Sequence, residues 1–176
     1  NSIPVNATVS LLIQNPMEDV GKIQNIADSL KRLYGRSQEK MDFVINKRQS
    51  QEEMLVLRTE NQEKLVFLLN QLPDGVQCMS TQIPGLVETS LNLGIFSLEQ
   101  EQAVYHLSLR SSVAYELQSL SKKIKALAAF VGAEAESGSD YPAWEYRSKS
   151  KLRELFCDTY SLLYNKNPKT AAIHAG

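Results

Sequence analysis

The chain has 176 residues, of which 43% are hydrophobic and 22% are charged, a composition typical of a folded globular protein rather than a disordered one. Its 19 basic and 20 acidic residues give a formal net charge of −1, so there is no basic excess to neutralise phosphates, and nucleic acid is not expected as a partner. No apolar run approaches the roughly 20 residues that cross a bilayer, and residues 1–10 lack the basic and apolar regions of a signal peptide, so no membrane partner is expected.

The first third of the chain predicts two strands on either side of a helix. Apolar and polar residues alternate over residues 3–13, which is typical of a half-buried strand. Asn15-Pro16 ends that pattern. Apolar residues then recur at three- and four-residue steps over residues 20–33 and predict an amphipathic helix, with Gly35 at its left-handed C-terminal position. Residues 41–47 predict a second strand.

The middle of the chain predicts a helix followed by a hairpin. A weak capping box at Thr59 precedes a leucine stripe that ends before Pro73-Asp74-Gly75. Residues 77–85 have the composition of a loop. Residues 86–96 and 103–110 then alternate as two further strands, with the hairpin tip near residues 98–100.

The last third predicts two helices and a final strand. Ser112 is suited to cap a helix whose apolar stripe continues to Val131 and which Gly132 ends. A turn-rich break follows at residues 137–145. The next helix covers residues 148–164, and residues 170–176 look like the start of a buried strand.

These elements together predict an α+β fold, in which amphipathic helices cover one face of an antiparallel sheet. A loose duplication of strand–helix units is visible within residues 1–140. The terminal helix–strand pair, residues 141–176, instead resembles part of a layered α/β domain. The predicted domain boundary therefore lies near residue 140.

The two strands of the predicted hairpin carry the main polar constellation of the sequence. Matching their polar faces requires Asn92 opposite His106, Ser90 opposite Ser108, and Glu88 opposite Arg110. Two interpretations follow. The stripe is a solvated sheet face with one cross-strand ion pair worth about 0.5 kcal/mol, or it binds a polar ligand whose carboxylate Arg110 holds in a bidentate fork.

No other pattern in the sequence supplies catalytic chemistry. His106 and His174 are the only histidines and show no metal-ligand spacing, so no metal ligands are predicted within the chain. A lone histidine on an apolar strand, such as His174, is typical of a core or edge residue. Cys78 and Cys157 have no local partner and are typical of reduced thiols in a cytoplasmic protein, with a disulfide between them as the less favoured alternative.

Several segments, in the same order, resemble the cytosolic aminoacyl-histidine dipeptidases, also called cytosol non-specific dipeptidases. The similar segments are NSIP (1–4), GLVETSLNLG (85–94), LSLRSS (107–112), the passage ending in DYPAW (128–144), and YNKNPKTAAIHAG (164–176). Together they span the chain from its first residue to its last. Residues 15–75 match the family mainly in pattern.

The resemblance implies a role within a larger enzyme. The family has an α/β catalytic domain with an inserted lid, or dimerisation, domain, so residues 1–140 would be lid and residues 141–176 would return to the catalytic domain. The parent would be a cytoplasmic dipeptidase with two zinc ions that hydrolyses dipeptides such as Xaa-His, and the resemblance allows either a homodimer or an internally duplicated lid that imitates one. The family's metal ligands lie outside this sequence, so this fragment should bind no metal and be inactive alone.

The resemblance also assigns substrate-binding roles to individual residues. Arg110 matches an arginine that binds the free carboxylate of the substrate, and Asn1 matches an asparagine that helps hold the scissile carbonyl oxygen. Asn92 and His106 are predicted to line the same face. A second hypothesis is a non-catalytic dimerisation or interaction module that has the same fold.

Overall fold

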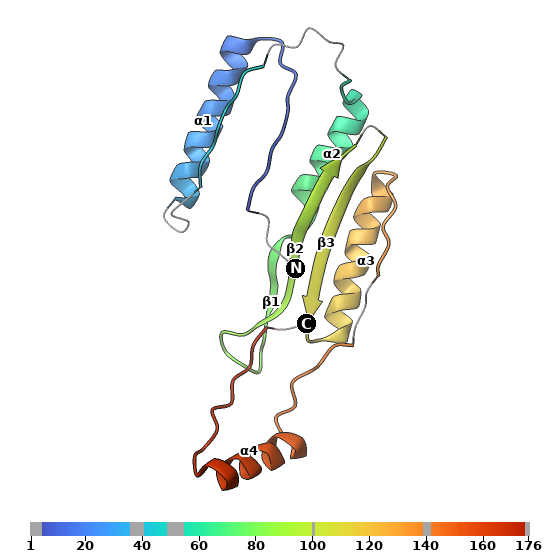
Figure 1. The fold of residues 1–176 in the computed structure, drawn as a ribbon. Coiled ribbons are helices and arrows are strands. Elements are labelled where there is room, and N and C mark those ends of the chain that lie inside the picture. Colours follow the sequence, from blue (N-terminus) through green and yellow to red (C-terminus); the bar gives the residue numbers. More distant parts are fainter. Residues whose placement is uncertain (1–4, 36–40, 49–54, 100, 139–141, 175–176) are drawn as a thin grey trace. The chain divides into compact units, whose positions relative to one another are not determined.

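In a computed structural model of the chain, residues 5–35, 41–48, 55–99, 101–138 and 142–174 are described (Figure 1). The chain divides into two compact units. One comprises Ala7–Arg58, and the other comprises Asn1–Asn6 together with Thr59–Gly176. The smaller unit contains helix α1. The larger contains helices α2, α3 and α4 and the antiparallel sheet β1-β2-β3.

Helix α1, Pro16–Tyr34, confirms the helix predicted from the apolar periodicity. Proline stands in its first turn, where no backbone N–H is needed, and acidic and basic residues lie at the ends that the helix dipole favours. The predicted left-handed cap is wrong. Gly35 has a φ of −63°, and its N–H donates to the Lys31 carbonyl, so the helix ends in right-handed backbone.

The strands predicted over residues 3–13 and 41–47 are wrong for the residues that the structure describes, because residues 5–13 and 41–48 have no regular secondary structure. The alternation indicates which side chains share a face, but a strand also needs a neighbouring chain to pair with. In the described residues these segments have none, and Val5 and Val9 are 89% and 76% exposed. Residues 3 and 4 lie outside the described part.

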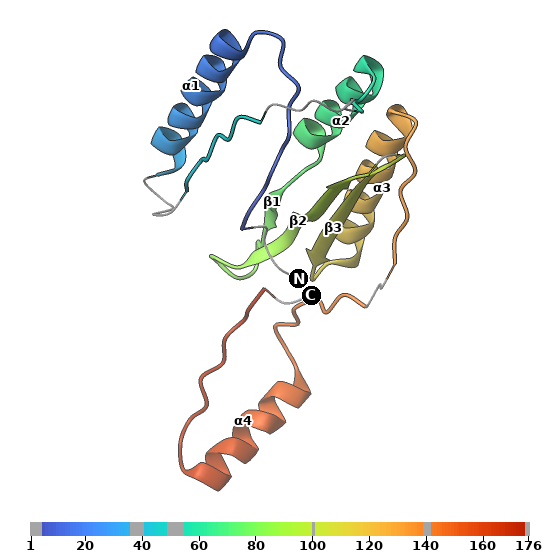
Figure 2. The same cartoon turned by 45° about the horizontal axis from the view of Figure 1, so that its top comes forward.

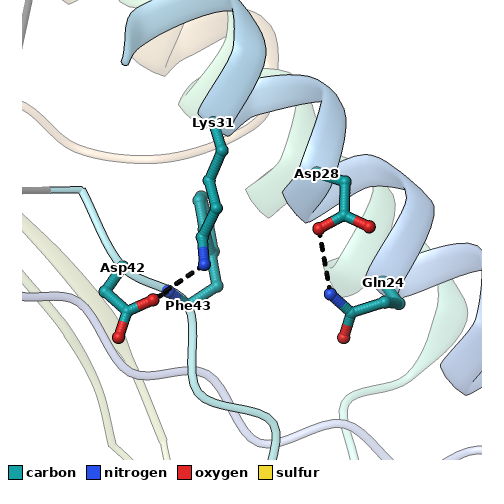
Figure 3. A network of polar contacts seen from close by, with 5 residues as sticks. All are labelled: Gln24, Asp28, Lys31, Asp42 and Phe43. Atoms are coloured by element: carbon teal, nitrogen blue, oxygen red, sulfur yellow. Dashed lines mark hydrogen bonds and ion pairs between the residues drawn. The ribbon is translucent and has the colours of Figure 1, made fainter.

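An ion pair ties residues 41–48 to α1 instead (Figure 3). Lys31 Nζ lies 2.7 Å from Asp42 Oδ1, and the same carboxylate oxygen accepts the Phe43 N–H at 2.9 Å. The ammonium also lies 5.9 Å from the centroid of the Phe43 ring. The hydrogen bond from Lys31, then the hydrogen bond from the Phe43 N–H and the charge of Lys31, lower the pKa of Asp42 below its usual value of 3.8.

The sheet confirms the predicted hairpin and adds a strand. Strands β2, Val87–Leu98, and β3, Ala103–Ser111, pair antiparallel, and β1, Gly75–Met79, pairs with the other edge of β2. The prediction of a loop from residue 77 is therefore wrong at its start. The strand is short and its register with β2 shifts twice, so its side chains show no clean alternation from which it could be recognised.

The register between β2 and β3 differs from the prediction by two residues. Ser90 lies opposite Arg110 where Ser108 was predicted, and Asn92 lies opposite Ser108 where His106 was predicted. The expected matching of polar with polar side chains is retained. Side chains repeat every two residues along a strand, so a shift of two leaves the faces unchanged and the sequence pattern cannot detect it.

A bulge between Leu93 and Ile95 then exchanges the faces for the rest of β2. Ile95 lies opposite His106 on the open face, although simple alternation along β2 would put it on the same face as Leu91. Phe96 lies opposite Tyr105 on the helix side, with the two rings 4.9 Å apart.

Helices α2, Thr59–Gln71, and α3, Ala114–Phe130, accompany the sheet, and α3 runs alongside β3 in both views (Figures 1 and 2). Leu91 packs against Leu120 and Ile124 of α3, and this cluster forms the centre of the core. The Tyr105 hydroxyl donates to the Leu65 carbonyl of α2 at 3.3 Å, and burial raises the pKa of Tyr105. The sheet therefore has one covered face.

The ends of α3 confirm one prediction and correct another. Gly132 adopts the left-handed conformation just after the helix, with a φ of +74°. Ser112 does not cap the helix. Val113 occupies the N-cap position, and its N–H donates a hydrogen bond to the Ser111 hydroxyl oxygen at 3.0 Å.

Helix α4, Lys151–Tyr164, begins at a Ser150 cap whose hydroxyl accepts the Arg153 N–H, and it ends at a left-handed Asn165. None of its described residues is buried. The strand predicted at residues 170–176 is wrong for residues 170–174, which have no regular secondary structure. Residues 175 and 176 lie outside the described part of the chain.

Acid should release residues 41–48 from α1. Because the folded pKa of Asp42 is lowered, its contribution is present above pH 3.8 and is lost as the pH falls through the folded value. We expect the Phe43 amide signal in NMR spectra to move as this carboxylate titrates. The signal should not move in D42N, and an unchanged titration in that variant would contradict the contact.

Leu91 should dominate the stability of the sheet, because it is 0% exposed and lies at the centre of the core. L91A is expected to lower the free energy of unfolding by about 2–5 kcal/mol in urea titrations. The matched control is I95A on the same strand, where the side chain is 60% exposed and the loss should stay below about 1 kcal/mol. Equal losses in the two variants would show that the sheet has no such centre.

Candidate ligand-binding face

The face of the sheet opposite α3 carries a short ladder of polar side chains. Ser90 lies directly opposite Arg110, and Asn92 lies opposite Ser108 in the adjoining pair on the same face. All four side chains are half-buried. The helices hold the apolar residues Leu91, Leu107 and Leu109 on the other side, and this fixes the polar residues on the open face.

Arg110 has no anionic partner among the residues that the structure describes. The predicted ion pair with Glu88 is wrong, because the Ser112 N–H donates to the Glu88 carbonyl and Glu88 therefore lies one position beyond the Thr89–Ser111 pair. The Glu88 carboxylate instead lies 3.9 Å from Cys78 Sγ. The half-buried Arg110 thus presents a guanidinium with five N–H donors on the open face.

His174 reaches this face from a distant part of the chain. Its Nε2 lies 2.7 Å from the Ser90 hydroxyl, although the two residues are 84 positions apart. This contact holds His174 on strand β2. No local signal could have identified Ser90, because the contact joins two segments with unrelated patterns.

The two other predicted site residues that the structure describes, Asn92 and His106, differ in how close they lie to Arg110. Asn92 lies one pair away from Ser90 and Arg110, close to the centre of the ladder. His106 is exposed opposite Ile95, four positions along β3 from Arg110, a separation of about 13 Å. The structure therefore does not bring His106 next to Arg110. Asn1 lies outside the described residues.

Within the ranges that the structure describes, no group of three or more histidine, cysteine, aspartate or glutamate residues is arranged to hold a metal ion. Of the helices described, none combines the length and the apolar character that crossing a membrane requires. Cys78 and Cys157 are free thiols.

The fold and this face define an α+β domain that presents an arginine and hydrogen-bonding side chains on an uncovered sheet face. The chain is similar to the cytosol non-specific dipeptidase of Escherichia coli (strain K12), with 26% identity over 178 residues that cover all of this chain and 36% of the relative. A solved structure, the aminoacylhistidine dipeptidase from Vibrio alginolyticus, matches with a TM-score of 0.76 and 27% identity over 90% of this chain and 32% of that one. No model of a protein family matches the chain.

These matches confirm the resemblance found in the sequence. The chain is homologous to the aminoacyl-histidine dipeptidases, and it spans about a third of the length of these relatives. Its α+β fold, with helices and an antiparallel sheet, is also confirmed.

Proposed function

We propose that this chain is the lid segment of a dipeptidase, in which Arg110 binds the free carboxylate of the substrate. The observation that carries the proposal is the half-buried Arg110 on an open sheet face, whose guanidinium has no anionic partner in the described part of the chain. Homology to dipeptidases supplies a ligand with a matching group, since every dipeptide with a free C-terminus carries a carboxylate.

The chemistry of an arginine fork suits this task. A guanidinium donates two parallel N–H bonds to a carboxylate, which fixes the orientation of the ligand as well as its charge. Asn92, one pair along the ladder, is suited to hydrogen-bond a peptide group of the same ligand. Asn1 and His106 are proposed as further contacts, with Asn1 near the scissile carbonyl. His106 lies too far along β3 to share the carboxylate with Arg110.

Metal chemistry would have to come from outside this chain. The described residues do not fit a zinc centre, because they contain no cluster of three or more suitable ligands. In the proposed parent enzyme two zinc ions would be held by the remainder of the protein. The lid would close over the bound substrate, hold it in place and exclude water.

Residues 141–176 are proposed to return the chain to a catalytic domain, with the lid ending near residue 140. Support comes from α4, whose apolar side chains Leu155 and Phe156 are both 64% exposed, as expected for a helix that packs on structure outside this chain. A cytoplasmic location and a homodimer are proposed on the homology alone.

The carboxylate role predicts a selective effect of changing Arg110. The 176-residue chain should bind glycyl-histidine more tightly than its C-terminal amide in NMR titrations. R110A should lose this preference and bind the acid at least about tenfold more weakly, whereas R110K should retain part of it. The exposed Arg147 provides the matched control, and R147A should behave as wild type. Unchanged binding in R110A would exclude this role.

The chain by itself should not hydrolyse peptides, because its described residues offer no metal centre. Purified chain mixed with Zn²⁺ and glycyl-histidine is expected to release no histidine above the buffer control. Metal-dependent turnover would contradict the lid assignment. If the chain neither turns over nor binds dipeptides but forms a stable dimer, the result would favour a non-catalytic interaction module.

A further inference from the structure

A second hydrogen-bonding group lies beside Arg110, and it comes from the far end of the chain. The His174 ring contacts the Ser90 hydroxyl at 2.7 Å, and Ser90 is the direct cross-strand partner of Arg110. Directly opposite residues on one face have Cβ atoms about 4.5–5.5 Å apart. An imidazole held on Ser90 is therefore within reach of a small group bound to the guanidinium.

Both groups have unused donor capacity. In the described part of the chain, His174 makes no polar contact other than the one through Nε2, and the Arg110 guanidinium makes none. When the Ser90 hydroxyl donates to Nε2, the proton of a neutral imidazole resides on Nδ1, which then becomes a donor. A carboxylate has two oxygens and about four lone-pair sites, so it can accept from both residues at once.

We propose that Ser90, Arg110 and His174 form a composite carboxylate site. Arg110 binds the charge, and His174, oriented by Ser90, donates a further hydrogen bond to the same carboxylate. This inference rests on the proposed function and deepens it, because it assigns His174 a direct contact with the ligand. It also selects a free carboxylate over an amide, since an amide offers one acceptor oxygen in place of two.

The composite site couples ligand binding to the position of residues 170–174. His174 lies on that segment, whereas Ser90 and Arg110 lie on the sheet. Ser90 and His174 are 84 positions apart in the sequence. A ligand that contacts both must favour the docked segment over the undocked one, and by linkage the docked segment must favour the ligand. Glycyl-histidine should therefore slow cleavage of the chain near residues 165–174 by a protease, whereas its C-terminal amide should not.

Binding titrations of His174 variants test the proposal directly. H174A should weaken binding of glycyl-histidine by about tenfold and leave binding of the amide unchanged. In H174Q the amide nitrogen can take the place of Nε2 and donate to the Ser90 hydroxyl oxygen, which keeps the contact with Ser90 in the reverse direction, but the second ring nitrogen is absent. It should therefore weaken binding as H174A does. If H174Q binds like wild type, His174 acts only by anchoring the segment, and the proposal is overturned.

Ser90 variants separate orientation from general damage to the sheet. S90A should weaken binding of the acid by about threefold to fivefold, because His174 loses its orienting partner. The matched control is S97A, the same substitution further along β2 opposite Val104, which should leave binding unchanged. Equal effects of S90A and S97A would also overturn the proposal.

Comparing R110A with H174A distinguishes failure of the proposed function from failure of the composite site alone. If the wild-type chain does not prefer the acid over the amide, both the proposed function and the composite site are refuted. If R110A abolishes the preference but H174A leaves it intact, the carboxylate role of Arg110 stands and the composite site is refuted. Loss of the preference in both variants, with unchanged thermal unfolding of each, supports the composite site.

Discussion

The complete burial of Leu91 is the constraint on which the rest of the larger unit depends. Leu91 lies in the central strand, with Gly75 on one side and Leu109 on the other, and α3 covers it through Leu120 and Ile124. Because side chains alternate along a strand, burying Leu91 turns Ser90 and Asn92 to the opposite face. The position of the polar ladder is thus a consequence of the apolar core, and so is the presentation of Arg110.

Periodicity predicted the elements that are held by their own contacts. The apolar stripes located α1, α3 and α4 within a few residues, because a helix satisfies its backbone within one segment. The strand predictions failed for residues 5–13 and 41–48, because a strand needs a neighbouring strand that the pattern does not specify. The register of β2 and β3 failed for a related reason, since a shift by two residues preserves every face.

The candidate site could also be predicted only in part from the sequence. Alternation predicted that Arg110 and Asn92 share one face, which the register confirms, whereas only the family resemblance singles out the arginine for a role in binding. The register shift of two residues places Ser108, and not His106, opposite Asn92, and the bulge between Leu93 and Ile95 then brings Ile95 opposite His106; neither could be foreseen from the alternation. The contact between Ser90 and His174 joins segments whose sequences share no pattern, so only the folded chain brings it to light.

The distance in sequence between Ser90 and His174 has a consequence for how the molecule is made. The sheet and α3 form from residues 75–130, whose contacts are comparatively local, so this part can fold as soon as it leaves the ribosome. The contact to His174 closes a loop of 84 residues, and the entropy of closing it is lost only after those residues have been synthesised. The order of translation therefore separates the appearance of the scaffold from the completion of its polar face.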